Sequence, residues 1–77
     1  MSLHQMSTSE RLGQLREHLR EVENQLSSPE VADDRQRMAE LARDHQRLQE
    51  TVAIAEQLEA AERKAEEARE LMRSEKD

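Results

Sequence analysis

Apolar residues recur every three or four positions along most of the chain, and this spacing predicts two helices. In the first segment the steps are 3, 4, 3 and 4, which place one narrow apolar stripe on one face of a helix. The stripe consists of Leu12, Leu15, Leu19, Val22 and Leu26. Ser7 and Glu10 have the spacing of a capping box, so we expect this helix to span about residues 8–27.

The stretch LSSPEVADD, which follows this stripe, interrupts the helical pattern. It contains Pro29, the only proline of the chain. Proline has no N–H group and disfavours the helical conformation of the residue before it, so the first helix must end here. We expect a turn at residues 28–33. Asp33 and Gln36 again have capping-box spacing, which predicts a second helix over about residues 33–74 that starts at Asp33 or Asp34, with Asp33 favoured.

The second helix carries two stripes on neighbouring faces, because the phase of the pattern changes near its middle. The first stripe, which we expect to pack against the first helix, consists of Met38, Leu41, His45, Leu48 and Val52. The second stripe, which we expect to face a partner, consists of Ile54, Leu58, Ala61, Ala65, Ala68 and Met72. A helix that changes its apolar face usually changes the element that it contacts.

These elements predict an all-α fold, an antiparallel helical hairpin with a short first helix and a long second one. The first helix, about 27 Å long, covers only the near half of the second, about 63 Å long. We therefore expect residues 7–77 to be a truncated part of a larger helical domain, and the chain to form a weak homodimer through the far half of the second helix. Residues 1–6, which begin with MSL, are expected to be a vector remnant or disordered.

Composition narrows the function classes. The chain has no aromatic residue and no cysteine, 39% of its residues are charged, and its net charge is −6. An acidic chain is poorly suited to gripping RNA or an anionic membrane through its overall field. No apolar run approaches the length of about 20 residues that a membrane span requires. These features predict a soluble cytoplasmic protein.

No candidate chemistry emerges from the residues, so we expect neither an enzyme nor a cofactor. The histidines lack the spacing of a metal site, and the only glycine, Gly13, excludes a glycine-rich phosphate loop. His45 is expected to be a polar residue that fixes the register of the two helices. Arg43 and Arg47 are interpreted as solubilising residues in preference to phosphate ligands.

Three segments in order resemble a known family: LSSPEVADD, then LARDHQRLQETVAIAEQL, then EARELMRSEKD. They are similar to the N-terminal helical domain of bacterial class-I peptide chain release factors, and the resemblance covers residues 11–77. Within this family the chain looks more like the factors that read UAA and UAG than like those that read UGA.

This resemblance implies a part in translation termination. The whole factor would read a stop codon on the ribosome and promote hydrolysis of peptidyl-tRNA through a Gly-Gly-Gln loop. The helical domain would be non-catalytic, would position the factor near the base of the ribosomal stalk, and would influence the GTPase release factor. Two alternatives remain at this point: a free-standing coiled-coil adaptor or co-chaperone, and the helical arm of a seryl-tRNA synthetase, which the net charge of −6 disfavours.

Overall fold

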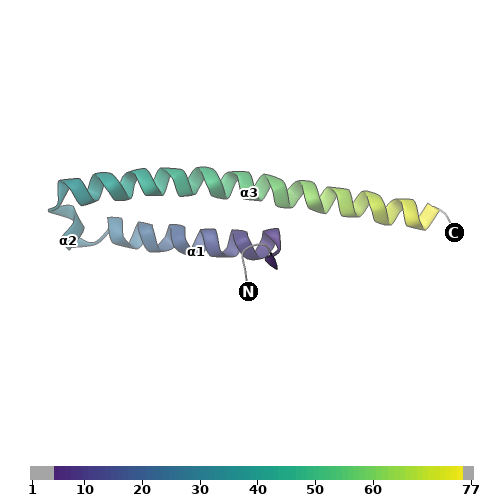
Figure 1. Cartoon of the computed structure of the whole chain (residues 1–77), viewed down its shortest axis with the longest axis horizontal. Coiled ribbons are helices and arrows are strands. Elements are labelled where there is room, and N and C mark those ends of the chain that lie inside the picture. Colours follow the sequence, from purple (N-terminus) through teal and green to yellow (C-terminus); the bar gives the residue numbers. More distant parts are fainter. Residues whose placement is uncertain (1–4, 76–77) are drawn as a thin grey trace.

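The computed structural model describes residues 5–75, and within them the chain folds into helices only. In order, α1 spans Thr8–Leu26, α2 spans Pro29–Ala32 and α3 spans Arg35–Glu75. α1 lies antiparallel to α3 as far as Glu62, and the remainder of α3 extends beyond it (Figure 1). The predicted all-α helical hairpin is therefore confirmed. Of the segment expected to be a remnant or disordered, residues 1–4 lie outside the described part.

The ends of α1 follow from its caps. The Ser7 hydroxyl accepts a hydrogen bond of 3.0 Å from the Glu10 N–H, which satisfies one of the free donors at the helix start. At the other end the Ser27 N–H still donates to the Glu23 carbonyl, at 3.2 Å. The backbone then leaves the helical conformation at Ser28, whose φ is −74° and ψ 132°, as expected for a residue that precedes proline.

The segment PEVA, where the sequence predicts a short turn, forms a single helical turn, α2. The N–H groups of Val31 and Ala32 both donate to the Ser28 carbonyl, at 3.1 and 3.2 Å. Pro29 occupies the first position of this turn, where its missing N–H costs nothing and its fixed φ suits a helix. α2 contacts both α1 and α3, so it closes the end of the hairpin.

The cap of α3 is Asp34, the second of the two predicted starts, and not the favoured Asp33. The Asp34 carboxylate accepts a hydrogen bond of 3.0 Å from the Arg37 N–H, and the Asp34 carbonyl accepts one of 2.9 Å from the Met38 N–H. Asp33 itself still has the helical conformation that ends α2, with φ −88° and ψ −5°. The capping box between Asp33 and Gln36 is therefore wrong, because the helical turn of α2 shifts the start of α3.

The molecule is a rod that measures 66 × 23 × 15 Å. Its length is set by α3, because 41 residues at 1.5 Å each span about 62 Å. The buried apolar residues of the described chain are Leu12, Val22, Leu41 and Val52, all in the part of the rod where α1 and α3 overlap. None of the helices within residues 5–75 combines the length and the apolar character that a membrane crossing requires.

Candidate functional site

The stripes predicted to join the two helices are shielded from solvent along their whole length. Four of these residues are buried and the other six are half-buried. The half-buried ones are Leu15, Leu19, Leu26, Met38, His45 and Leu48. The hairpin therefore has a thin apolar contact that is open to water on both flanks.

One flank of this contact carries polar links between α1 and α3. They are Thr8 Oγ1 to Glu62 Oε1 at 2.7 Å, Ser9 Oγ to Glu59 Oε2 at 2.5 Å, Arg16 Nη2 to Glu56 Oε1 at 3.6 Å, and His45 Nε2 to Glu23 Oε2 at 3.1 Å. The sequence reasoning did not find these pairs. The spacing of seven among Ser9, Arg16 and Glu23 is a signal that one face of α1 repeats, but the partners depend on the register of the two helices.

His45 is the only polar member of the contact stripes, and its side chain is 23% exposed. Its Nε2 lies at hydrogen-bond distance from the Glu23 carboxylate on the opposite helix. This contact spans the hairpin at one defined level, so it favours one register over neighbouring ones. Glu23 is half exposed to water, at 52%, and such a pair contributes about 1 kcal/mol or less to stability.

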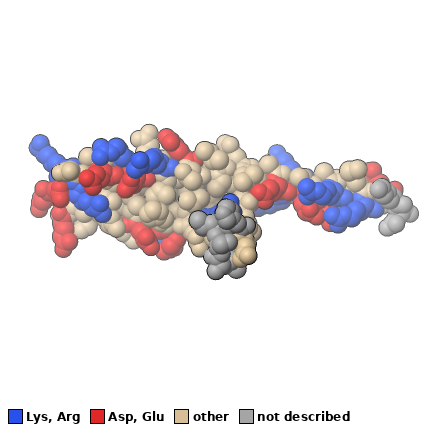
Figure 2. Space-filling view, viewed as in Figure 1, with Lys and Arg blue, Asp and Glu red and all other residues tan. Residues whose placement is uncertain are grey.

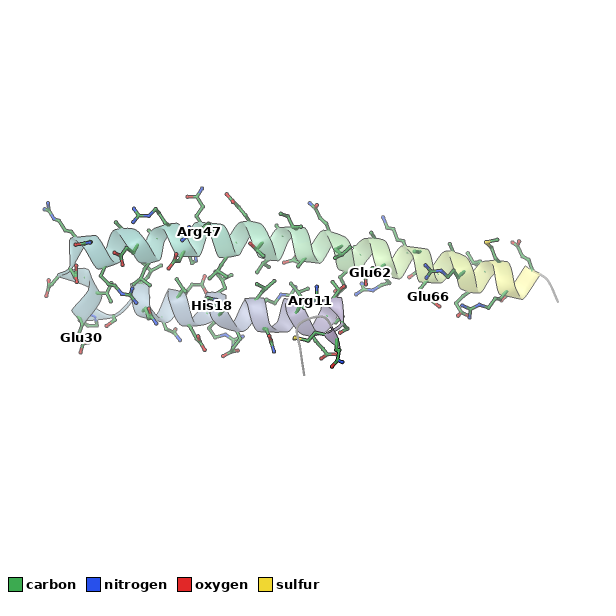
Figure 3. The ribbon with its side chains drawn as sticks, in the orientation of Figure 1. Arg11, His18, Glu30, Arg47, Glu62 and Glu66 are labelled. Carbon is green, nitrogen blue, oxygen red and sulfur yellow. The ribbon has the colours of Figure 1, made fainter. Side chains whose placement is uncertain are left out.

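The other flank is hollowed into a shallow groove between the two helices, which we call the α1–α3 groove. Half-buried Leu15 and Leu48 form its floor. His18 from α1 and Asp44, Arg47 and Thr51 from α3 form its walls. Figure 3 labels His18 on α1 and Arg47 on α3.

The rim of this groove is mainly basic. On α1 the surface continues to Arg11 and Gln14. On α3 it continues to Arg43, Gln46 and Glu50. The Arg47 guanidinium forms an ion pair with Asp44 within α3. The groove combines an apolar floor with arginines whose carbon stems can cover further apolar surface.

The stripe predicted to face a partner is exposed throughout the far half of α3. Its large residues are Ile54, Leu58 and Met72, which are 66%, 51% and 63% exposed. Leu71, which does not belong to the stripe, is also 66% exposed. Exposed apolar side chains arranged along one face are typical of a contact surface that a monomer leaves open.

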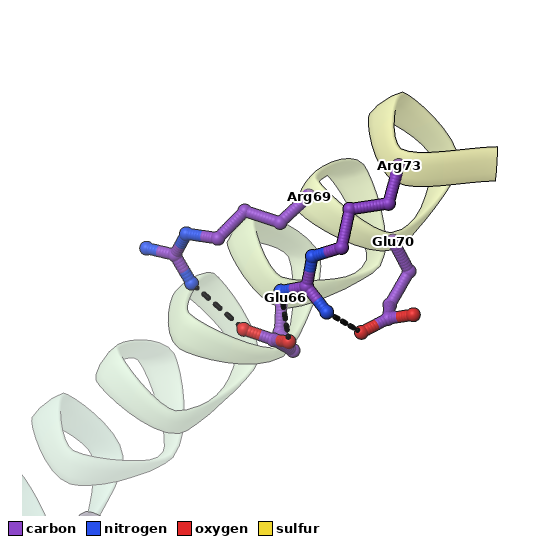
Figure 4. A network of polar contacts seen from close by, with 4 residues as sticks. All are labelled: Glu66, Arg69, Glu70 and Arg73. Carbon is purple, nitrogen blue, oxygen red and sulfur yellow. Dashed lines mark hydrogen bonds and ion pairs between the residues drawn. The ribbon is translucent and has the colours of Figure 1, made fainter. Parts of the chain in front are cut away.

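Charged residues beside this stripe pair with one another along the helix. Arg69 lies 2.9 Å from Glu66, and Arg73 lies 2.6 Å from Glu70 and 3.4 Å from Glu66 (Figure 4). Each exposed pair of this kind stabilises a helix by about 0.2–0.5 kcal/mol. The network therefore supports the far half as a helix. Figure 2 shows the same mixture of acidic and basic side chains along the visible face of both halves.

The carboxylates and histidines of residues 5–75 do not gather into a group that could hold a metal ion. The two surfaces that the fold presents are the α1–α3 groove and the exposed stripe. Both are suited to contact with another macromolecule.

Comparison with known families identifies a domain that covers most of the chain. The family model described as PCRF domain matches residues 15–77, which include the second half of α1, α2 and all of α3. Among curated proteins none matches the chain significantly, and the same holds for solved structures.

Proposed function

The chain belongs to the PCRF-domain family of peptide chain release factors, which act in translation termination, and on this premise we propose that it is a non-catalytic positioning module of such a factor. The observation that carries the proposal is the extent of the match. It covers residues 15–77 and so includes the turn and the whole long helix. This match favours a release factor over a free-standing adaptor and over the arm of a tRNA synthetase.

A non-catalytic role is supported by what release of the peptide requires. The resemblance assigns hydrolysis to a Gly-Gly-Gln loop, and the only glycine of these 77 residues is Gly13, within α1. The side chains of the described hairpin are arranged as a thin apolar contact with exposed ion pairs. Such a surface can bind and orient, but it offers no enclosed pocket in which water could be activated.

A positioning role is supported by the shape of the chain. A rod of 66 Å fixes the distance between its two ends, and the groove and the stripe give it contact surfaces in both halves. We propose that it contacts the ribosome near the base of the stalk, where it influences the GTPase release factor. We further propose that the factor is of the kind that reads UAA and UAG, that it acts in the cytoplasm, and that the isolated chain self-associates weakly through the far half of α3.

Two measurements test this role. Added at saturating concentration to ribosomes that hold peptidyl-tRNA and a stop codon, the chain should release no peptide above the background without factor. Puromycin supplies the control that the peptide is reactive. In pelleting experiments the chain should sediment with ribosomes, and Lys64→Cys carrying a cross-linker should mark components of the stalk base. Release above background, or labelling spread over the ribosome surface, would contradict the proposal.

A further inference from the structure

The α1–α3 groove and the exposed stripe of α3 lie on the same side of the molecule. Thr51 lines the groove, and the stripe begins three residues later at Ile54 and continues four residues later at Leu58. Steps of three and four keep side chains on one face of a helix. The apolar floor of the near half therefore continues into the apolar stripe of the far half.

The two halves of α3 also have matching lengths. α3 has 41 residues, so its midpoint is Ala55, and 20 residues lie on either side of it. α1, with 19 residues, runs along the near half and reaches Glu62 just beyond the midpoint, through the polar links on the flank opposite the groove. If two copies pack antiparallel about a two-fold axis near Ala55, the far half of each α3 lies along the near half of the other.

We propose that a second copy of this chain docks in this way, with the far half of its α3 in the α1–α3 groove. Each end of the dimer then contains three helices: α1 and the near half of α3 from one copy, and the far half of α3 from its partner. This proposal rests on the self-association included in the proposed function, and it specifies the register of that association.

Charge complementarity favours this occupant. The groove and its rim carry three arginines and a histidine against two acidic residues; the basic ones are Arg11, His18, Arg43 and Arg47. The far half, residues 56–75, has seven acidic and four basic residues. A net negative helix therefore lies beside a net positive rim. Opposite charges of this kind fix register and suppress alternative pairings.

The extent of contact distinguishes this register from the simpler one in which only the far halves meet. With the two-fold axis near Ala55, all 41 residues of each α3 lie along the α3 of the partner. In the simpler register the axis lies near Ala65, and only about 20 residues of each α3 lie along the partner. The groove register also covers Ile54, Leu58 and Met72 with side chains of both partner helices. The small alanines between them allow the helices to approach closely.

The chain has no cysteine, so a single introduced thiol reports the register directly. Under mild oxidation Ile54→Cys should give a covalent dimer, because residues beside the axis meet their own copies. Ala65→Cys is the matched control: in the groove register its two copies are about 30 Å apart, beyond the Cα separation of about 4–7 Å that a disulfide spans. In the alternative register, Ala65→Cys should form a disulfide between the two copies, and Ile54→Cys should not.

A charge substitution tests whether the groove is occupied. His18→Glu adds a negative charge to the exposed groove wall and should weaken the dimer about two- to fivefold, measured by sedimentation equilibrium. Gln49→Glu adds the same charge at an exposed position of α3 outside the groove, and should leave association unchanged. Leu58→Glu should weaken the dimer about tenfold or more by burying a charge, while circular dichroism shows the hairpin still helical.

Each outcome is decisive. Links through Ile54→Cys together with the selective effect of His18→Glu support docking in the groove. Links through Ala65→Cys alone, or equal effects of His18→Glu and Gln49→Glu, overturn the groove register but leave self-association standing. A monomer of 9.0 kDa at every concentration overturns both. None of these results bears on the release-factor role, which the ribosome experiments test separately.

Discussion

The substitution Leu41→Ala tests whether the thin contact between α1 and α3 holds the hairpin together. The Leu41 side chain is 2% exposed, whereas Leu58, on the same helix, is 51% exposed. Leu58→Ala therefore makes the same chemical change at a side chain that remains half exposed beside α1. The difference between the two variants isolates the effect of burial from that of helix propensity.

The expected loss follows from the shape of the contact. Leu→Ala at a buried site costs about 2–5 kcal/mol, and least where neighbouring atoms can close the cavity. A contact open to water on both flanks closes readily, so we expect about 2–3 kcal/mol for Leu41→Ala. Leu58→Ala should cost about 0.5 kcal/mol or less. For a chain of 77 residues the total stability is about 4–11 kcal/mol, so the first change removes a large share of it.

Differential scanning calorimetry measures both losses, because its transition follows the buried contact between α1 and α3. At this chain length about 2–3 kcal/mol lowers Tm by about 10–20 °C, whereas Leu58→Ala should leave Tm within a few degrees. The comparison is made at concentrations where the wild-type chain is monomeric, so that association does not protect Leu58. Equal losses of stability in the two variants would show that packing against α1 does not stabilise α3, and would refute this account of the fold.

Three further predictions concern single positions. Gly13→Ala should stabilise the hairpin by about 0.5–1 kcal/mol, measured by chemical denaturation. Gly13 lies within α1 with a negative φ, and an added Cβ meets nothing within 4 Å. A loss of stability would contradict the open space around Gly13. Asp34→Ala should cost about 0.5–2 kcal/mol through the lost cap of α3, while Asp33→Ala should cost only a few tenths, and the reverse order would restore the predicted Asp33 cap. Arg16→Ala should change stability by less than about 1 kcal/mol, because Arg16 and its partner Glu56 are both more than half exposed; a larger loss would mean that this pair is a main link of the hairpin.

The sequence predicts the hairpin well because apolar spacing and proline act locally. Steps of three and four along the chain identify the face of each helix, and Pro29 marks where the first must end. The short turn at PEVA is predicted, because proline ends one helix and suits the first position of a new helical turn. The sequence does not decide between Asp33 and Asp34 as the start of α3, since the two residues are chemically identical and only the length of α2 selects Asp34.

The candidate surfaces were only partly predictable. The exposed stripe can be predicted from the apolar spacing together with the lengths of the two helices, because these lengths show how much of the second helix the first one can cover. The α1–α3 groove and the polar links on the opposite flank depend on how α1 is rotated and shifted against α3. Contacts such as that between Arg16 and Glu56 join residues 40 positions apart, and a single sequence does not give this register.

The uncovered far half of α3 separates two signals that usually change together when a protein melts. Circular dichroism counts helical peptide groups, and the far half supplies about half of those in α3. The heat capacity of unfolding depends on the apolar surface that becomes exposed, and the buried residues of the described chain all lie in the other half. Helices without tertiary cover gain and lose their ends gradually. In the monomer the calorimetric transition will therefore report the hairpin, while the helical signal declines over a wider range from the free end of α3 inward. The van't Hoff and calorimetric enthalpies will disagree until another surface covers Ile54, Leu58 and Met72.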